Sequence, residues 1–450
     1  MTNGAVIGDH RHMPSQFEPP SGTRDFLAAD VEQREHAFTV IRDVFSRYGF
    51  EPLQTPAFER VDVLLGRYGE DADKLVFKIL RRGEHEATGE ADLALRYDMT
   101  VPLARVMAAY GSQLRMPYKR YALGPVWRAD RPGKDRYREF VQCDLDTLGS
   151  PSLLADAEVL SAQHDALAEL GLPGLTIQLN SRRVLAGLLE AFGVRPDLGA
   201  SVLISLDKLD KLPAAEVVAE LTGRGLGQDQ AGELVTALTA PDSVDRVRIA
   251  LAKTDEGTAG LDEVDTVLSL LSDHVPAGRI VFTPRMVRGL SYYTGPIWEL
   301  VAPGVAGSIG SGGRYDHLIE HLGGPDVPGT GGSIGVERIL ALLPRAADQA
   351  PRLDVAVTVM RPDLELQSFG FAAAARTAGL RASVYLGSSG KLRSQLKWAS
   401  DIGARWVVIY GEQEHEAGVA TVRDMRTGVQ AEVPAADVSD FLARAASEDS

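Results

Sequence analysis

The sequence predicts an α+β protein followed by a smaller, separate α/β domain. Two strand-like runs, at 118–130 and 137–149, are joined by the turn residues RPGKD, which predicts an antiparallel hairpin. From residue 352 onwards strand-like and helix-like segments alternate, which is typical of an α/β domain. At 450 residues the chain also exceeds one ordinary core and indicates two or three domains.

The elements before the hairpin and just after it follow from periodicity and turn residues. Apolar residues recur at helical spacing over 31–50, and Gly49 ends that helix. The further elements expected in this part are a strand at 51–56 closed by Pro56, helices at about 152–170 and 183–193, and a strand at 176–180 between them.

The second half of the chain begins with a helical region and then returns to strands. Short amphipathic helices punctuated by Gly, Pro and Asp predict a helical insertion at about 195–275. Strands are expected at 279–286, 291–302, 308–316 and in the glycine-rich run before a helix at about 335–343. The last domain is expected to contain strands at 353–360, 381–387, 405–411 and 419–425, with helices around 369–378 and 391–402.

These segments give a domain plan. We expect a flexible leader at 1–17, a core at 18–345 that includes the insertion, a linker at 346–351 and the α/β domain at 352–450. The first residues contain no continuous apolar stretch of the kind found in export signals.

Composition limits the class of protein. Hydrophobic residues make up 44% and charged residues 24%, a balance typical of soluble globular proteins, and no apolar run reaches the length of a membrane span. The single Cys143 excludes an intramolecular disulfide and a cysteine-rich zinc cluster, which fits a reducing cytoplasm. The net charge of −15 by itself favours a small-molecule enzyme over a nucleic-acid binder, so RNA binding would depend on local basic patches.

The hairpin is the first candidate site. Period-two alternation puts Gly124, Val126 and Arg128 on one face of the first strand, and Gln142, Asp144 and Asp146 on one face of the second. The opposite face of the second strand carries Val141, Cys143 and Leu145, which reads as a core layer with a structural cysteine. The acidic face is either a solvated sheet face or a ligand site. Cations in and beside the turn favour the site, namely Arg131, Lys134, Arg136 and Arg138.

Three further segments carry candidate residues. In LRYDMTVPLARV, Asp98 and Thr100 could accept hydrogen bonds from an ammonium group, or one of them could cap the following helix. In VRGLSYYTGPIWEL, Arg288 and Tyr293 can share one face only with a bend at Gly289; a core tyrosine and a surface arginine are the alternative.

The glycine-rich run GSGGRYD is not a Walker A loop, but it suits a strand that lets a ligand approach the backbone. Arg338 lies just inside a helix that follows a glycine-rich strand, a place where an anionic ligand binds, although most such arginines are solvated.

Together, in this order, the segments resemble the class II aminoacyl-tRNA synthetases, and specifically the histidyl-tRNA synthetase family. EPLQTPAFER is similar to motif 1, WRADRPGKDRYREFVQCDLD to motif 2 and GGSIGVERI to motif 3, while LRYDMTVPLAR and RGLSYYTG resemble the two histidine-specific boxes. The resemblance covers about residues 17–445. It implies a catalytic core built on a mostly antiparallel sheet with flanking helices, the helical insertion, and a C-terminal α/β domain like the anticodon-binding domain.

The resemblance also implies an activity and its partners. The protein would activate L-histidine with ATP and Mg²⁺, release pyrophosphate and transfer histidine to the 3′ end of tRNA(His), as a cytoplasmic homodimer paired through motif 1. No metal-binding side chains are expected. By position, the ATP ligands would be Arg128, Arg136 and Arg338; the catalytic arginines would be Arg288, Arg128 and Arg338; and the histidine ligands would be Asp98, Thr100, Gln142, Asp146, Arg288, Tyr292 and Tyr293.

Some residues depart from the family pattern, and two other functions stay open. The family usually has Asp where this chain has Ser291, and many bacterial members have Glu where it has Asp98, Asp130 and Asp146. One alternative is the synthetase-like regulatory subunit of ATP phosphoribosyltransferase. The other is a paralogue that adenylates histidine for a non-tRNA acceptor, or a histidine sensor. In the last domain, the basic residues near one helix face that could contact RNA, or simply be solvated, are Lys391, Arg393 and Lys397.

Overall fold

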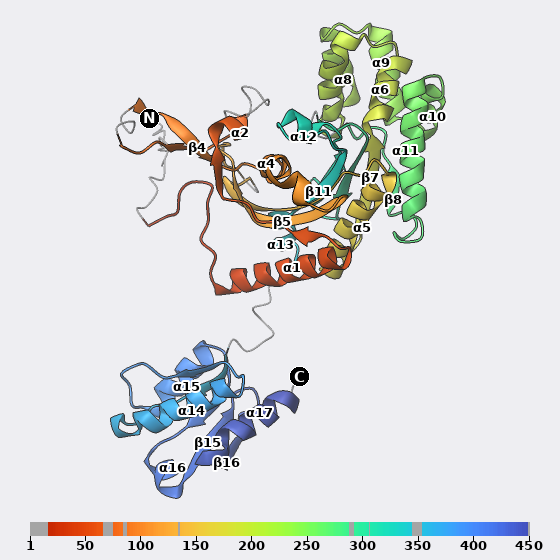
Figure 1. Ribbon diagram of the computed structural model, residues 1–450. Coiled ribbons are helices and arrows are strands. Elements are labelled where there is room, and N and C mark those ends of the chain that lie inside the picture. Colours follow the sequence, from red (N-terminus) through yellow and green to blue (C-terminus); the bar gives the residue numbers. More distant parts are fainter. Residues whose placement is uncertain are drawn as a thin grey trace, which may run out of the picture. The chain divides into compact units, whose positions relative to one another are not determined.

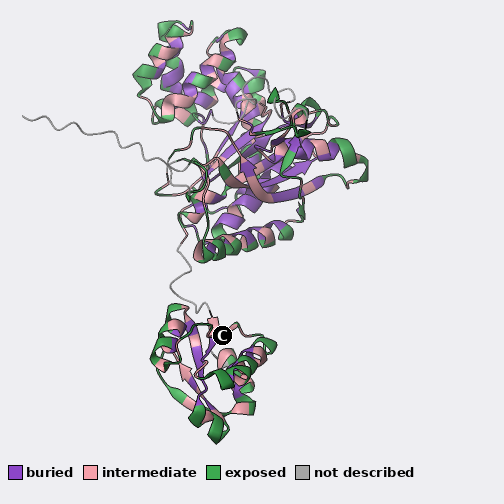
Figure 2. Ribbon diagram, turned by 90° about the vertical axis from the view of Figure 1, so that its left-hand side faces the viewer, coloured by how far each residue is buried: buried purple, intermediate pink, exposed green. Residues whose placement is uncertain are grey.

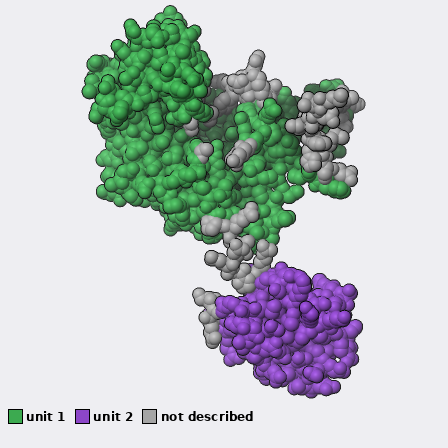
Figure 3. Space-filling model, turned by 180° about the vertical axis from the view of Figure 1, so that it is seen from behind, with its two compact units in different colours: residues 1–345 green, residues 346–450 purple. Residues whose placement is uncertain are grey.

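The computed structural model describes residues 17–65, 75–83, 88–133, 136–287, 292–305, 307–343 and 353–448. The chain divides into two compact units, residues 1–345 and 346–450, which Figure 3 shows in different colours. Each unit has its own buried apolar core. Among the described residues, no helix combines the length and the apolar character that crossing a bilayer requires.

The first unit is built on one sheet of eight strands. All pairs within it are antiparallel except the two outermost, β1–β5 and β7–β8, which are parallel. The strands, in spatial order, are β1 (Glu51–Pro52), β5 (Tyr118–Trp127), β6 (Glu139–Leu148), β11 (Gly329–Gly335), β10 (Gly310–Arg314), β9 (Pro296–Val301), β7 (Thr176–Ser181) and β8 (Ile280–Phe282). The expected α+β core with a mostly antiparallel sheet is therefore confirmed.

One face of this sheet packs on two long helices. Helix α1 (Ala28–Arg47) ends before Gly49, whose φ of 77° suits glycine, and α5 (Leu153–Glu169) begins where the Ser152 hydroxyl accepts a hydrogen bond from the Leu154 amide. Cys143 and Leu145 of β6 are fully buried in the same core as residues of both helices. Figure 2 shows the central strands as the most buried part of the unit. The interpretation of Cys143 as a core residue is confirmed.

The other face of the hairpin carries the polar residues that alternation predicted. Gln142 lies opposite Gly124, and Asp146 lies opposite Arg120, a residue that the sequence analysis did not single out. A small antiparallel sheet that the sequence did not predict lies in the same unit, with the order β2 (Phe58–Arg60), β4 (Ala91–Leu95), β3 (Lys78–Leu80). The helices near it are α2 (Val61–Leu65) and α4 (Thr100–Tyr110), the latter followed by the 3₁₀ turn η2 (Gly111–Gln113).

The expected helical insertion follows β7 as a group of helices beside β7 and β8 (Figure 1). Its first and last helices, α6 (Arg182–Ala191) and α11 (Asp255–Leu271), pack very closely because glycines face each other. A Cβ on Gly187 would lie 2.4 Å from the Cα of Gly257. Between them lie η3 (Pro196–Leu198), α7 (Gly199–Leu206), η4 (Asp207–Asp210), α8 (Ala214–Gly223), α9 (Gln228–Thr239) and α10 (Ser243–Leu251).

The end of the first unit differs from expectation at one point. The strand expected over 291–302 begins only at Pro296, and Tyr292 and Tyr293 precede it. Proline has no N–H to give to a ladder, which suits the first residue of a strand. Two short helices complete the unit, α12 (Leu318–His321) and α13 (Val336–Leu340).

The second unit is a five-stranded mixed sheet with helices. Its strand order is β13 (Ala382–Val384), β12 (Leu353–Val357), β14 (Ala404–Ile409), β15 (Val419–Asp424), β16 (Gln430–Pro434), parallel in the first two pairs and antiparallel in the last two. The helices are α14 (Glu365–Thr377), α15 (Leu392–Asp401), α16 (Glu412–Ala417) and α17 (Val438–Glu448), with the 3₁₀ turns η6 (Pro362–Leu364) and η7 (Ala435–Asp437). The sequence did not predict α16, β16 or α17.

Candidate functional site

A buried ion pair lies at the centre of the candidate site. Arg120 is 0% exposed, and its Nη2 lies 2.6 Å from Oδ2 of Asp146 on the neighbouring strand. The hydroxyl of Tyr315, which directly follows β10, donates to the other oxygen of the same carboxyl. Asp146 is therefore held by a cation on one side and a phenol on the other. Its position is also fixed by Gly331 of β11, where a Cβ would lie 2.0 Å from Oδ1 of Asp146.

Several polar atoms beside this pair have no hydrogen-bond partner among the described residues. They are Nε and Nη1 of Arg120, Oε1 of Gln142 and Oδ1 of Asp144. Together with Asp146, these residues form what we call the polar face. Buried polar groups normally have partners, and an unpaired one costs about 1–3 kcal/mol. The polar face therefore has donors and acceptors to offer a polar ligand, and the solvated-sheet alternative is wrong, because Asp144 and Asp146 are buried.

Burial dominates the electrostatics of the two aspartates. It raises the pKa of Asp144 to about 7, an effect that the charge of Arg120 opposes and that of Asp146 reinforces. Burial likewise raises the pKa of Asp146, against the charge of Arg120 and the Tyr315 hydrogen bond. Because a guanidinium stays protonated in proteins, Arg120 favours the ionised form of the Asp146 carboxyl.

Asp98 and Arg128 lie at the edge of the polar face. Oδ1 of Asp98 accepts a hydrogen bond from the Val101 amide at 3.0 Å. This contact is the helix-capping alternative, because Val101 lies in the first turn of α4, which begins at Thr100. Burial raises the pKa of Asp98, and the charges of Arg128 and Arg120 oppose that shift. The Arg128 Nε donates to the Tyr97 carbonyl, 3.1 Å away, and its guanidinium lies over the ring of Phe140.

Three tyrosine rings lie beside Asp146. The Tyr292 ring is 4.8 Å from that of Tyr293 and 6.1 Å from that of Tyr315, centroid to centroid. Burial raises the pKa of Tyr293, and the charges of Asp146 and Asp144 raise it further. Tyr293 therefore stays a hydrogen-bond donor near the aspartates.

A cavity of about 580 Å³ adjoins this group. Tyr293, Trp298 and Gly312 line it from the sheet side, and Leu203 and Ile204 from helix α7 of the insertion. A half-buried cation, Arg182, also lines it, and burial lowers the pKa of Arg182. Tyr293 thus belongs both to the group around Asp146 and to a cavity of the size that small-molecule ligands occupy.

Two of the predicted arginines make their recorded contacts with residues outside this grouping. The exposed Arg136 pairs with Asp130 at 2.9 Å, and Arg338, also exposed, donates to the Ser308 carbonyl. Arg288, Ser291 and Lys134 lie outside the described residues. The expected convergence of Arg128, Arg288 and Arg338 on one pocket therefore stays a prediction.

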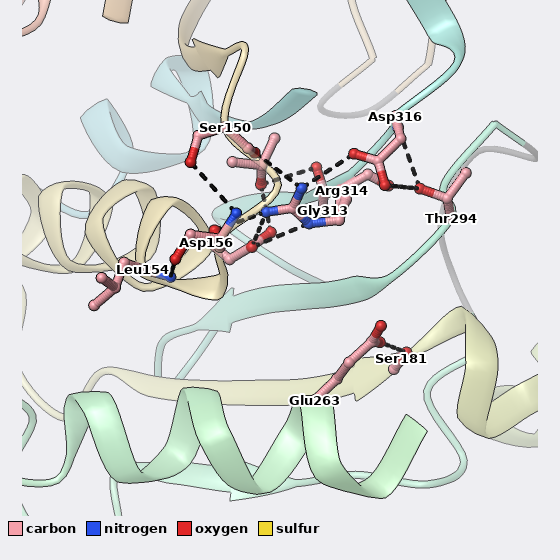
Figure 4. A network of polar contacts seen from close by, with 11 residues as sticks. Ser150, Leu154, Asp156, Ser181, Glu263, Thr294, Gly313, Arg314 and Asp316 are labelled. Carbon is pink, nitrogen blue, oxygen red and sulfur yellow. Dashed lines mark hydrogen bonds and ion pairs between the residues drawn. The ribbon is translucent and has the colours of Figure 1, made fainter. Parts of the chain in front are cut away.

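The arginine of the GGRYD motif has a different task from its tyrosine. Whereas Tyr315 contacts Asp146, Arg314 points towards the start of α5, where its Nε and Nη2 donate to the buried Asp156 (Figure 4). Its other donors reach the carbonyls of Ser150 and Ser152 and the carboxylate of Asp316. This network fixes β10 against the loop before α5, and so positions Tyr315.

Sequence reasoning missed three members of the site: Arg120, Asp144 as a titrating group, and Tyr315. The signal for Arg120 was present, because the alternation that joins Gly124 to Arg128 continues backwards through Ala122 to Arg120. The pairing of Tyr315 with Asp146 joins residues 169 positions apart, and no local pattern contains it.

Comparison with known proteins identifies the family of the chain. A family model described as histidyl-tRNA synthetase matches residues 22–339, and one described as anticodon binding domain matches residues 354–445. A relative from Gloeobacter violaceus named histidine–tRNA ligase is 38% identical, over 94% of this chain and 97% of the relative. One of the same name from Ruegeria pomeroyi is 39% identical, over 92% and 90%.

Solved structures agree with the fold. The crystal structure of histidyl-tRNA synthetase from Nostoc sp. matches with a TM-score of 0.79 and 29% identity, over 96% of this chain and 100% of that one. A Bacillus halodurans protein described as an ATP phosphoribosyltransferase regulatory subunit/histidyl-tRNA synthetase matches with a TM-score of 0.73 over 89% of this chain and 100% of that one. Its identity is only 20%, so it shows the fold alone.

Proposed function

Because the chain belongs to the histidyl-tRNA synthetase family, we propose that it is a histidine–tRNA ligase. It activates L-histidine with ATP to histidyl-adenylate, releases pyrophosphate and transfers the histidyl group to the 3′ end of tRNA(His). The observation that carries the proposal is the buried carboxyl of Asp146, oriented by Arg120 and Tyr315 beside a cavity.

Recognition of the imidazole depends on that carboxyl. Arg120 and Tyr315 fix the two oxygens of Asp146, and the carboxylate accepts a hydrogen bond from a ring N–H. Tyr293, with Tyr292 packed on it, lines the adjoining cavity and offers a second hydroxyl to the ring. A site built on such hydrogen bonds rejects analogues that lack the polar group by a factor of about 10⁴ or more, because its buried groups are then left unpaired.

The remaining proposed roles concern the α-amino and carboxylate groups of histidine and the phosphates of ATP. Asp98, Thr100 and Gln142 bind the α-amino group, for which the unpaired Oε1 of Gln142 is a suitable acceptor. Arg288 bridges the histidine carboxylate and the α-phosphate, while Arg128, Arg136 and Arg338 bind the phosphates of ATP. Attack of one anion on another requires positioning and charge neutralisation, which guanidinium groups provide because they remain charged and bind bidentately.

Mg²⁺ is expected with the nucleotide. Two groupings of described residues place possible cation ligands within reach of one another, one around Asp165 and one around Asp326, and neither contains a residue proposed to bind ATP. We therefore propose that Mg²⁺ arrives on the ATP phosphates, where it neutralises charge.

The second unit is proposed to bind tRNA, on the strength of its match to the anticodon-binding family. Lys391, Arg393 and Lys397 are exposed at α15, although Lys397 also pairs with Asp401 at 2.6 Å. Replacing the three cations by alanine is expected to weaken tRNA binding and to reduce its salt dependence, measured by filter binding over a range of salt. Unchanged salt dependence would exclude this helix as a contact.

We further propose a cytoplasmic homodimer that pairs through the segment resembling motif 1. The small sheet, whose strand β2 is the end of this segment, exposes Phe58, Ile79 and Leu80, apolar side chains suited to burial between copies. Light scattering of the eluted protein tests the mass: a monomer at micromolar concentration contradicts the dimer.

The activity is tested by histidine-dependent exchange of pyrophosphate into ATP. Wild type is expected to catalyse exchange, and Arg288→Ala to lose about 10²–10³-fold, the usual cost of removing one group that stabilises charge in the transition state. Arg285→Ala, three residues away and exposed, is the matched control. Absence of exchange in wild type would contradict the proposal. Exchange without transfer of labelled histidine to tRNA would instead identify an adenylating paralogue.

A further inference from the structure

A second cluster of titratable side chains lies away from the polar face. His164 and Asp165 are neighbours on α5, Tyr48 follows the end of α1, and His274 follows the end of α11. Nδ1 of His164 is 3.1 Å, and Nε2 of His274 3.0 Å, from the same oxygen, Oδ1 of Asp165. Two imidazoles from distant parts of the chain therefore direct a ring nitrogen at one carboxylate oxygen.

These distances fit a shared cation. Zn²⁺ binds His nitrogen and carboxylate oxygen at about 2.0–2.2 Å, and a tetrahedral arrangement then separates the ligand atoms by about 3.3 Å. The three donor atoms all lie within 4.8 Å of one another. The side chains of His164, Asp165 and His274 are 12%, 29% and 41% exposed, so an ion can reach them.

Neighbouring residues hold the proposed ligands in place through hydrogen bonds. The Tyr48 hydroxyl donates to Oδ2 of Asp165 at 2.6 Å, which leaves Oδ1 for the ion, and it also lies 3.3 Å from Nε2 of His274. Ligating carboxylates are commonly held in this way by an outer hydrogen bond. Tyr48 and His274 also line a cavity of about 650 Å³, with Ser161 and Glu158 on its wall, which gives an ion an entry path and room for a water ligand.

We propose that His164, Asp165 and His274 bind one Zn²⁺ ion, with water as the fourth ligand, and that the ion ties α5 of the core to the end of α11 of the insertion. The site is independent of the catalytic proposal, because it shares no residue with the polar face. Its consequence is structural: with the ion bound, the last helix of the insertion is fixed to the helix that supports the central sheet.

The chain provides a matched comparison. His317, Glu320 and Asp326 form a second possible group, but all three are exposed, and His317 Nδ1 lies 3.5 Å from Asp326 Oδ1. Held by no outer hydrogen bond among those described, this group is expected not to retain an ion, and His317→Gln serves as the control variant.

The test is titration of the metal-free full chain with ZnCl₂ by calorimetry, together with hydrogen exchange of α5 and α11. Wild type and His317→Gln are expected to bind one equivalent and to slow exchange in both helices. His274→Gln is expected to lose this binding, and Tyr48→Phe, which keeps all three ligands, to weaken it about 10–100-fold.

Two results would overturn the proposal. One is wild-type protein that takes up no Zn²⁺, which would mean that the two imidazoles simply donate hydrogen bonds to Asp165. The other is a His274→Gln or Tyr48→Phe variant that binds as tightly as wild type. Melting of each variant in EDTA, compared with wild type in EDTA, separates loss of the ion from loss of the fold.

Discussion

The raised pKa of Asp144 predicts a measurable dependence of stability on pH. In the folded protein the carboxyl is 5% exposed, and burial moves its pKa from 3.8 to about 7. Between these pH values the folded state holds a proton that the unfolded chain has released. The contribution of this group to stability is therefore full below the lower pKa and is lost as the pH rises through the higher one. The loss is about 1.4 kcal/mol per pH unit, and about 4 kcal/mol in all.

Asp144→Asn isolates this effect, because an amide of nearly the same shape is neutral at every pH. We expect the free energy of unfolding of the variant, minus that of wild type, to grow by about 1.4 kcal/mol per unit from about pH 5 to about pH 7, and then to level off. Urea denaturation of both proteins over about pH 5 to 8, monitored by tryptophan fluorescence, measures the difference. The contribution of the second unit to the free energy of unfolding is the same in both proteins and cancels. A difference that stays constant over this range would refute the assignment of a raised pKa to Asp144.

Two further substitutions test how the site is built. Gly331→Ala places a Cβ against the carboxyl of Asp146 and is expected to lower kcat/KM for histidine about 100-fold in pyrophosphate exchange, whereas Gly232→Ala, which has open space around it, leaves exchange unchanged. Arg314→Met removes the partner of a buried aspartate and is expected to cost about 3–5 kcal/mol in urea denaturation. Arg195 pairs with Asp197 on the surface, and Arg195→Met is expected to lower the free energy of unfolding by no more than about 1 kcal/mol. If Arg314→Met lowers it by no more than this control does, the buried network is not needed for stability.

Local patterns in the sequence were sufficient for the hairpin and for the sides of its strands. Alternation placed Cys143 in the core and Asp144 and Asp146 on the opposite face, because a strand has period two and its register leaves no other choice. Alternation could not decide whether that opposite face is exposed to solvent or buried. That outcome depends on what covers the sheet, which no single strand encodes.

The small sheet was missed because its strands are short. Strands β2, β3 and β4 have three to five residues, which is too few to show a period. The tyrosines before Pro296 read as a strand because aromatic residues are common in strands, yet proline placed the start of the ladder after them. Contacts between distant segments, such as Tyr315 with Asp146, could not be predicted because no local pattern contains both residues.

The glycine-rich strands β10 and β11 show how one sheet can support a core and a site at once. The glycines of β10 were interpreted as room for a ligand near the backbone, but in both strands neighbouring side chains occupy that room. On one face, Gly331 makes space for the Asp146 carboxyl and Gly313 for the Tyr293 ring, while on the other a Cβ at Gly312 would meet the indole of Trp298. Because successive residues alternate between faces, each added methyl group would disturb either the side that carries Asp146 and Tyr293 or the packing behind it. The glycines therefore make room for these side chains, and a ligand is expected to meet the side chains rather than the bare backbone.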